Sequence, residues 1–495
     1  MKKKYIYVWT CLCASLDTSI CLSDIPEIES STYQAPFDEI VFDWSRTWAE
    51  VMQLVKKKHY KINNAVKATS KAINEFLNHL DPHSAFLDPE TYTRIIESTS
   101  GEFFGIGVHI DNRRESKDKH LILIDVIPDG PADQAGLEPG DKIVEVAGKP
   151  LEGLDTDAII AMIKGERKTK VHIKVLREGQ PDLLEFDIVR DVVKDQSAMS
   201  FHIKKHDIYY ISLSVFSHNA IEQMSNLLKK AKDQNYRGLI IDLRNNSGGL
   251  LDAVVDICGF FVDKGSLVAS TKDKTGKVTA QYKTEKAPIF ISDVPIFILI
   301  NNYTASAAEI LAGCLQIHSN NPKNNKKLKA FLVGSKTFGK GSVQEIIPVS
   351  SNSAIKLTTS LYYLPNDETI QGIGIEPDFD IERTMPPTKQ MQWFTKFYGR
   401  EEVLKNSIKA HPEQKEAKKE ESPTSSDDKP KRWQERAKEM LQKDNQLRAT
   451  ITLINTLHMA QECCPDKVKN RADAIHFLKS TYLAGDELEI EEVKA

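Results

Sequence analysis

Continuous apolar runs alternate with amphipathic ones between about residues 205 and 385. The runs DIYYISL, RGLIIDL, VPIFILI and KAFLVG are apolar at nearly every position, which is typical of strands buried on both faces of a sheet. The segments between them, such as NAIEQMSNLLKKAKDQ and SAAEILAGCLQI, carry apolar residues at helical spacing. Strands that alternate with helices predict βα units, so we expect a layered α/β domain here.

The pattern differs on the N-terminal side of this domain. Residues 37–100 are expected to be helical, with a helix that ends at Asp81 because Pro82 restricts the residue before it. Residues 101–192 contain short β-type runs, including FFGIGVHI, HLILIDVI and VHIKVLRE, and two short helix-type runs. This stretch is therefore predicted to be a small β-rich domain, placed before a core that spans residues 193–385 and to which residues 37–100 contribute.

Polar and amphipathic segments follow the core. Residues 411–433 combine six acidic and six basic side chains with almost nothing apolar, and we expect them to form a flexible linker. Residues 434–495 are expected to be helical, and their run LRATITLINTLHMA is amphipathic. Because such a helix must bury its apolar face, we expect the chain to form homo-oligomers.

The N-terminus has the features of a secretory signal peptide. Residues 1–23 combine the basic start MKKK, the apolar stretch YIYVWTCLCASL and small residues near Cys21. Asp17 lies close to the apolar stretch and weakens the pattern, and a lipid anchor at Cys21 is a poorer match. We therefore expect an exported protein of the periplasm or cell envelope, with a cytosolic chain as the alternative.

Composition narrows the functional classes. The chain has 495 residues, 40% of them hydrophobic and 27% charged, as expected for a globular protein of several domains. Its formal net charge of −4 does not favour nucleic acid as a partner. The seven cysteines form no disulfide framework. Cys258 and Cys314 lie in apolar runs, where a cysteine is usually a small core residue.

Nucleotide and metal sites are not supported. GSKTFGKG is similar to a nucleotide-binding P-loop, but Gly341 stands where that motif needs Ser or Thr, and a strand-like run follows. The pairs His202–His206 and His79–His83 are poor metal ligands, because the first lies in a strand-like run and a proline interrupts the second. We expect no nucleotide, no metal and no other cofactor, and we expect these four histidines at the surface.

A candidate nucleophile lies at the junction of a strand and a helix. The sequence INNYTASAAE joins the run VPIFILI to a helix, and Ser306 with Glu309 matches a capping box. One interpretation is that Ser306 only caps the helix. The other is that this serine stands clear of the sheet, where the free N–H groups of the helix favour a developing oxyanion. Small residues at Ala305 and Ala307 would let a substrate backbone approach.

A serine nucleophile needs a base, and the best candidate is a lysine. Lys340 lies in TFGKGSVQ between two glycines, on a predicted turn between strands. Its amine must be neutral to accept a proton at neutral pH. Burial would therefore have to lower the pKa of the amine by roughly 3 from its usual value. Gln344 lies four residues further on, on the same face of an extended chain, where its amide could orient the amine.

Two glycine-containing segments complete the candidate chemistry. LIIDLRNNSGGLL ends a strand in a turn, where the N–H of Gly249 or Gly248 could bind a reacting carbonyl oxygen, although the segment also fits an ordinary βα turn. FFGIGV opens the β-rich domain, and such a loop can bind a terminal carboxylate while a strand edge pairs with a peptide. The candidate peptide-binding residues are Phe104, Gly105, Ile106 and Gly107.

Taken together, these segments resemble the C-terminal processing peptidases, also called tail-specific proteases. The resemblance covers residues 38–385, with a fainter similarity near 443–455. The motifs follow the order of that family: LDPHSAFLDP, FFGIGV with GPADQAGLEPGDKIVEVAG, DLRNNSGGLL, NNYTASAAEI, GSKTFGKGSVQ and IQGIGIEPD. The resemblance implies an α/β fold: a layered protease core of the Clp-protease/crotonase type, an inserted PDZ-like β domain, and helical N- and C-terminal segments.

The resemblance also implies a function, a serine endopeptidase with a Ser–Lys dyad that cleaves proteins near their C-termini. It implies Ser306 as the nucleophile, Lys340 as the general base and Gln344 as the residue that positions the lysine. It implies the N–H groups of Gly249 and Ala307 as the oxyanion hole. The PDZ-like domain would bind the free C-terminal tails of protein or peptide substrates, and no cofactor is needed.

Some features depart from the family pattern, and other functions compete. The interval between the serine and the lysine is long, with HSNNPKNNKKLK as the apparent surplus, and Ser247 stands where the family usually has a glycine. The main alternative is a catalytically silent PDZ scaffold that binds protein tails. A crotonase-type acyl enzyme is a more distant one, because nothing in the sequence indicates a coenzyme pocket.

Overall fold

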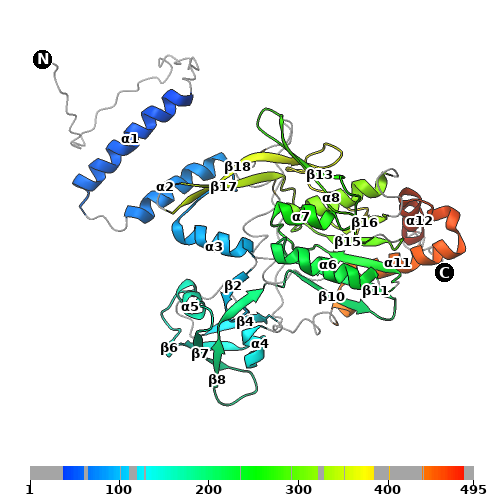
Figure 1. The fold of residues 1–495 in the computed structure, drawn as a ribbon, viewed down its shortest axis with the longest axis horizontal. Coiled ribbons are helices and arrows are strands. Elements are labelled where there is room, and N and C mark those ends of the chain that lie inside the picture. The colour runs from blue at the N-terminus through cyan, green and yellow to red at the C-terminus, as the bar shows by residue number, and fades with distance from the viewer. Residues whose placement is uncertain are drawn as a thin grey trace, which may run out of the picture. The chain divides into compact units, whose positions relative to one another are not determined.

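The computed structural model describes most of the chain (Figure 1), namely residues 37–60, 65–100, 102–110, 120–127, 130–194, 196–232, 234, 236–290, 293–321, 328–349, 352–383, 401, 408, 438 and 440–483. The predicted signal peptide and linker lie outside these residues. The chain divides into a unit of residues 1–68 and a unit of residues 69–495. The described part contains no helix that is both long and apolar enough to cross a membrane.

Helix α1 (Phe37–Lys58) is the described helix of the first unit. It exposes large apolar side chains, since Phe42 and Trp44 are each 69% exposed and Trp48 is 47% exposed. Within that unit, these side chains are left in contact with solvent.

A six-stranded sheet forms the centre of the α/β core (Figure 1). Its order is β10-β11-β12-β15-β16-β19, with β10 antiparallel to β11 and all later pairs parallel. The strands are β10 (Ala198–Ile203), β11 (Ile208–Leu213), β12 (Gly238–Asp242), β15 (Ile296–Ile300), β16 (Ala330–Gly334) and β19 (Phe379–Asp380). Strands β12, β15 and β16 are buried at every residue, which confirms what their continuous apolar runs predict.

Helices cover both faces of this sheet. On one face lie α6 (His218–Lys232), α7 (Leu251–Cys258) and α8 (Ala307–Asn320), in a core that also contains Leu239 and Ile241. The alternate residue of β12, Ile240, faces a second core with α11 (Asn445–Cys463), the short helix η2 (Pro465–Val468) and α12 (Arg471–Leu483).

The apolar face of α11 is thus buried against the sheet of its own chain. Its side chains Leu447, Ile451, Ile454 and Leu457 belong to that second core. The need to bury this face therefore gives no reason for self-association, and the homo-oligomer stays a prediction.

A second, five-stranded sheet contains a strand that the sequence pattern did not predict. It comprises β1 (Ala85–Leu87), β18 (Ala354–Tyr363), β13 (Leu267–Lys272), β14 (Val278–Lys283) and β17 (Ser342–Pro348), which pairs with β18. The region expected to be helical does contain α2 (Ala65–Leu80) and α3 (Pro89–Ser100). Between them, Pro82 prevents α2 from continuing, and β1 pairs antiparallel with β18.

The β-rich region has a hydrophobic core of its own. One sheet contains β3 (Val108–Ile110), β4 (Leu121–Val126), β5 (Lys142–Val146), β6 (Lys149–Pro150), β7 (Lys170–Leu176) and β8 (Leu184–Val189). Helices α4 (Pro131–Ala135) and α5 (Thr156–Ile163) accompany it, and β2 (Glu102–Gly105) pairs with β9 (Asp191–Lys194). The architecture agrees with the expectation of a layered α/β core, an inserted β domain and helical segments before and after them in the chain.

Candidate active site

Three turns at one edge of the parallel sheet hold the candidate catalytic residues. The turn after β12 carries Gly249, the turn after β15 carries Ser306, and the turn after β16 carries Lys340. Because β12, β15 and β16 are adjacent and parallel, their carboxyl ends lie at the same edge. Ligands of open α/β sheets typically bind at that edge.

Polar side chains join the first two turns. The Asn245 N–H donates to Asn301 Oδ1 at 3.0 Å, and Asn301 Nδ2 donates to Asn245 Oδ1 at 2.8 Å. The Ala305 N–H donates to the Asn246 carbonyl at 2.9 Å. These bonds give a role to the asparagines of LRNNSGG and INNYTAS, and they fix the serine turn against the glycine turn.

Ser306 has a strained backbone conformation. Its φ of 56° lies in the left-handed region, which a non-glycine residue rarely adopts without support from its surroundings. The support comes from Glu309 in the first turn of α8, whose carboxylate accepts the Ser306 N–H at 2.8 Å. Ser306 thus occupies the N-cap position of α8 and also the tip of a strained turn, which leaves both interpretations of the sequence open.

The Glu309 carboxylate binds the lysine turn as well as the serine. Its Oε2 accepts the N–H of Lys340 at 2.9 Å, and its Oε1 accepts the N–H of Gly339 at 2.8 Å and the hydroxyl of Thr337. The Glu309 side chain is fully buried. The sequence indicates Glu309 only as a capping partner, whereas the structure gives it donors from two separate turns.

Burial raises the pKa of Glu309 to about 7, and its four donors act in the opposite direction. The carboxyl that connects the two turns therefore changes its charge near neutral pH.

Lys340 lies half-buried in the turn between β16 and β17. Burial lowers the pKa of its amine below the ordinary value, and the positive charge of Lys356 lowers it further. The carboxylates of Glu401, Glu309 and Asp81 act in the opposite direction. The net direction is the one that a general base at neutral pH requires.

Gln344 makes different contacts from those that its spacing suggested. Its Nε2 donates to Ser342 Oγ at 2.9 Å and to Thr358 Oγ1 at 3.2 Å. The strand register shifts between Val343 and Gln344, so the simple alternation that would place Gln344 on the face of Lys340 is interrupted. Among the described contacts of Gln344, none is to the lysine amine.

Gly249 can be replaced by no other residue without moving its neighbours. Its φ is 142°, and an added Cβ would lie 2.2 Å from the carbonyl oxygen of Phe216. Of the two glycine N–H groups in this turn, that of Gly248 already donates to Asn246 Oδ1 at 2.8 Å. In the described part of the chain, no hydrogen bond is recorded from the N–H of Gly249 or of Ala307, the two groups expected to form the oxyanion hole.

The candidate peptide-binding residues lie at the start of the PDZ-like domain. Phe104 and Gly105 are in β2, paired with β9. The Ile106 side chain is 1% exposed and belongs to the domain core, and Gly107 has a φ of 82°. A peptide could therefore meet this loop through its backbone groups, but not through the Ile106 side chain.

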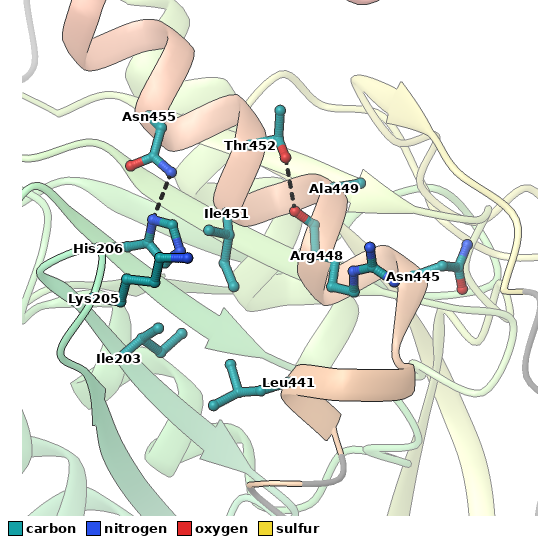
Figure 2. A pocket seen from close by; sticks show the side chains of 10 residues that line it. All are labelled: Ile203, Lys205, His206, Leu441, Asn445, Arg448, Ala449, Ile451, Thr452 and Asn455. Carbon is teal, nitrogen blue, oxygen red and sulfur yellow. Dashed lines mark hydrogen bonds between the residues drawn. The ribbon is translucent and has the colours of Figure 1, made fainter.

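One described cavity is lined by none of the candidate catalytic residues. It has a volume of about 760 Å³ and lies between the end of β10 and helix α11, next to Ile203, Arg448 and Ile451 (Figure 2). In its wall, His206 Nδ1 and Asn455 Nδ2 are 2.9 Å apart. This cavity and the candidate catalytic residues therefore share no lining residue.

Three of the four histidines differ from expectation, including His202, whose side chain is 30% exposed. His206 is half-buried in that cavity wall, and His83 is only 16% exposed, with its Nε2 2.7 Å from Glu401 Oε2. The prediction that these histidines are exposed at the surface is wrong for all three, and it holds for His79. Neither contact has a local sequence signature, because the partners are far apart in the chain.

Known proteins resemble this chain over most of its described length. A model of peptidase family S41 matches residues 207–381, and a PDZ-domain model matches residues 123–177. A carboxy-terminal-processing protease of Bartonella bacilliformis is 33% identical over 344 residues, which are 68% of this chain and 75% of that protein. The carboxy-terminal processing protease CtpA of Bacillus subtilis is 30% identical over 354 residues, 71% of this chain and 70% of that protein.

Solved structures also align with this chain. A photosystem II D1 C-terminal processing protease aligns over 68% of this chain and 87% of its own, with 26% identity and a TM-score of 0.40. The range matched by the S41 model contains both Ser306 and Lys340.

Proposed function

The chain belongs to peptidase family S41, as a carboxy-terminal-processing protease with a PDZ domain, and on that premise we propose that Ser306 and Lys340 form its catalytic dyad. The main support is the Glu309 carboxylate, one oxygen of which accepts the backbone N–H groups of both residues. Serine-type peptidases need a nucleophile and a base held within reach of each other, and this shared contact brings their backbones together.

The proposed reaction follows from the groups at the sheet edge. The neutral Lys340 amine takes the Ser306 proton as Oγ attacks the scissile carbonyl carbon. The N–H groups of Gly249 and Ala307 donate to the oxyanion that forms. When the C–N bond breaks, the lysine ammonium protonates the leaving amine. Water then attacks the resulting ester with Lys340 again as base, and releases the new carboxyl end and the free serine.

The described residues contain no hydrogen bond between the Ser306 hydroxyl and the Lys340 amine. Catalytic hydrogen bonds of free enzymes often form only in the complex with substrate. We therefore place the closing of this contact in the substrate-bound state, with Gln344 moving from its hydroxyl partners to orient the amine.

For substrate selection, we propose that the PDZ-like domain binds the free C-terminal tails of proteins. Gly107 has a left-handed conformation, which allows the loop to turn sharply and present its backbone to a carboxylate. Cleavage near the bound tail would then follow.

Two further properties are proposed from the terminal segments. Residues 1–23 direct export, because they combine a basic start with a short apolar stretch. The exposed Phe42, Trp44 and Trp48 of α1 become buried in a homo-oligomer, because exposed patches of this kind mark interaction sites.

The dyad is tested with Ser306→Ala and Lys340→Ala on an unfolded protein that has a free C-terminus. Each variant is expected to lose cleavage by roughly 10³-fold or more. Lys336→Ala is the matched control, because Lys336 lies near the same turn and pairs with the exposed Glu376. It should cleave within about twofold of the parent protein. Full activity of either dyad variant would refute the mechanism, and binding of tails without any cleavage by the parent protein would support the silent scaffold.

A further inference from the structure

The motif LDPHSAFLDP has no role in the proposed chemistry, yet its loop is tightly bonded. The buried Asp81 carboxylate accepts the N–H groups of His83 and Ser84, at 2.8 and 2.9 Å, and the hydroxyls of Ser84 and Thr358. Thr358 in turn accepts the amide of Gln344. The loop after α2 is therefore fixed to the strand next to Gln344.

His83 connects this loop to a residue far along the chain. Its Nε2 lies 2.7 Å from Glu401 Oε2, and Glu401 is fully buried. The Glu401 backbone N–H also donates to the carbonyl of Phe338 at 3.3 Å, two residues before Lys340. Glu401 lies beyond residue 381, where the S41 match ends.

From Glu401 the contacts continue to the lysine turn. Its Oε1 accepts the Gln371 amide at 2.8 Å, and Gln371 Oε1 accepts the N–H of Gly341 at 2.8 Å. Gln371 is fully buried, and an added Cβ on Gly341 would lie 2.6 Å from its backbone nitrogen. This chain of bonds ends at the residue directly after Lys340, while Glu309 holds Lys340 and Gly339 from the other side.

We propose that His83 and Glu401 are positioning residues that act through Gln371 to fix the turn of Lys340 for proton transfer. This inference rests on the proposed dyad. Neither residue touches the reacting atoms. Their effect is to hold the amine where the serine proton can reach it, and a displacement of about 1 Å in such a site can cost roughly 10²-fold in rate.

The charge of Glu401 supplies a second readout. Its carboxylate raises the pKa of Lys340, as do those of Glu309 and Asp81, whereas burial and Lys356 lower it. Glu401→Gln keeps the size of the side chain and one acceptor oxygen but removes the charge. The pKa of Lys340 must then fall, and the rising limb of the pH profile must move to lower pH. Simple loosening of the fold would not move it in that direction.

The experiment uses the full chain and measures kcat, KM and the pH profile on one peptide substrate. The variants are Glu401→Ala, Glu401→Gln, His83→Asn and the double variant His83→Asn with Glu401→Ala. The matched control is Glu376→Gln, an exposed carboxylate beside the same turn. Far-UV circular dichroism and thermal unfolding identify any variant that fails to fold, and Glu401→Gln retains a readout if Glu401→Ala fails.

We expect Glu401→Ala and His83→Asn to lower kcat by about 10- to 100-fold while KM changes by less than about threefold. The double variant should be no worse than the poorer single one, because both residues act through one chain of bonds. A kcat within about twofold of the parent protein in Glu401→Ala and His83→Asn would overturn the inference. So would a double variant whose loss of kcat is the product of the two single losses. A rising part of the pH profile that does not move in Glu401→Gln would overturn it as well.

Lys340→Ala in the same series separates this proposal from the proposed dyad. If Lys340→Ala is inactive while the His83 and Glu401 variants match the parent protein, only the positioning role is overturned. If Lys340→Ala is active, the dyad fails and the positioning role fails with it.

Discussion

Ser306 and Lys340 both donate their backbone N–H groups to the same oxygen of Glu309, at 2.8 and 2.9 Å. A helix-capping carboxylate therefore also holds the turn of a neighbouring strand. Because the two residues share one acceptor, a change at Glu309 must affect both at once.

Glu309→Gln is expected to reduce both stability and activity. The glutamine side chain has the same shape as glutamate, but one carboxylate oxygen is replaced by an NH₂ group. That group would face backbone N–H donors, which lose their acceptor. A buried donor left without an acceptor costs about 1–3 kcal/mol, so we expect a loss of that size in urea unfolding. Activity should fall by about 100-fold or more, because both turns shift. The control Glu345→Gln changes a largely exposed side chain on β17. Parent-like stability and activity in Glu309→Gln would contradict the role of this carboxylate.

The pKa of Glu309 also predicts how stability depends on pH. Burial raises the pKa from 4.5 to about 7 in the folded protein. Between these values the folded state holds a proton that the unfolded state has lost. The free energy of unfolding therefore falls as pH rises through this window, by roughly 3 kcal/mol.

The measurement compares urea unfolding at pH 4.5 and pH 8 in the parent protein and in Glu309→Gln. Glu309→Gln cannot titrate at this position, so its stability should fall less over the same range. Equal falls in the two proteins would show that Glu309 is not the group responsible.

Lys356→Met is expected to move the pH dependence of catalysis to higher pH. The charge of Lys356 lowers the pKa of Lys340, so its removal raises that pKa and shifts the rising limb of kcat/KM upward. Lys283→Met on the exposed side of β14 is the control and should leave the limb in place. A limb that stays fixed or moves down in Lys356→Met would contradict the assignment of Lys340 as the base.

Arg244→Ala is expected to destabilise the fold by about 3–5 kcal/mol. Arg244 pairs with Asp242 at 2.6 Å and with Asp444 at 2.8 Å, and all three side chains are less than a tenth exposed. Removing the shared cation leaves two buried carboxylates without the ion pairs that Arg244 supplies. Urea unfolding checks the loss, with Arg448→Ala on the exposed side of α11 as the control. A loss below about 1 kcal/mol would mean that the buried pairs add little.

Local patterns predict the centre of the fold well. The run VPIFILI becomes β15 and KAFLVG becomes β16, because continuous burial leaves a continuous apolar signature. The turns of the proposed dyad follow from the same reasoning, since Ser306 and Lys340 lie in the turns after these two runs. The order of the motifs along the chain also predicts the protein family, and the similarity to known proteins confirms it.

The contacts around the lysine turn could not be predicted in this way. His83 and Glu401 are 318 positions apart, and nothing near either residue marks the other as its partner. The strand β1 has only three residues, too few for a period to be recognised. For Glu309, the sequence does contain one indication, namely a carboxylate within an otherwise apolar helix. A charge that is buried in this way needs several hydrogen-bond partners.

The link between Arg244 and α11 has a consequence for the order in which the chain folds. Arg244 stands in the turn that leads to Gly249, and its Nη1 donates to Gln446, 202 positions later. During synthesis, the residues of α11 that contact this turn are therefore added long after the turn itself. An unfinished chain lacks that contact, so we expect this turn to reach its final arrangement only after α11 has been synthesised.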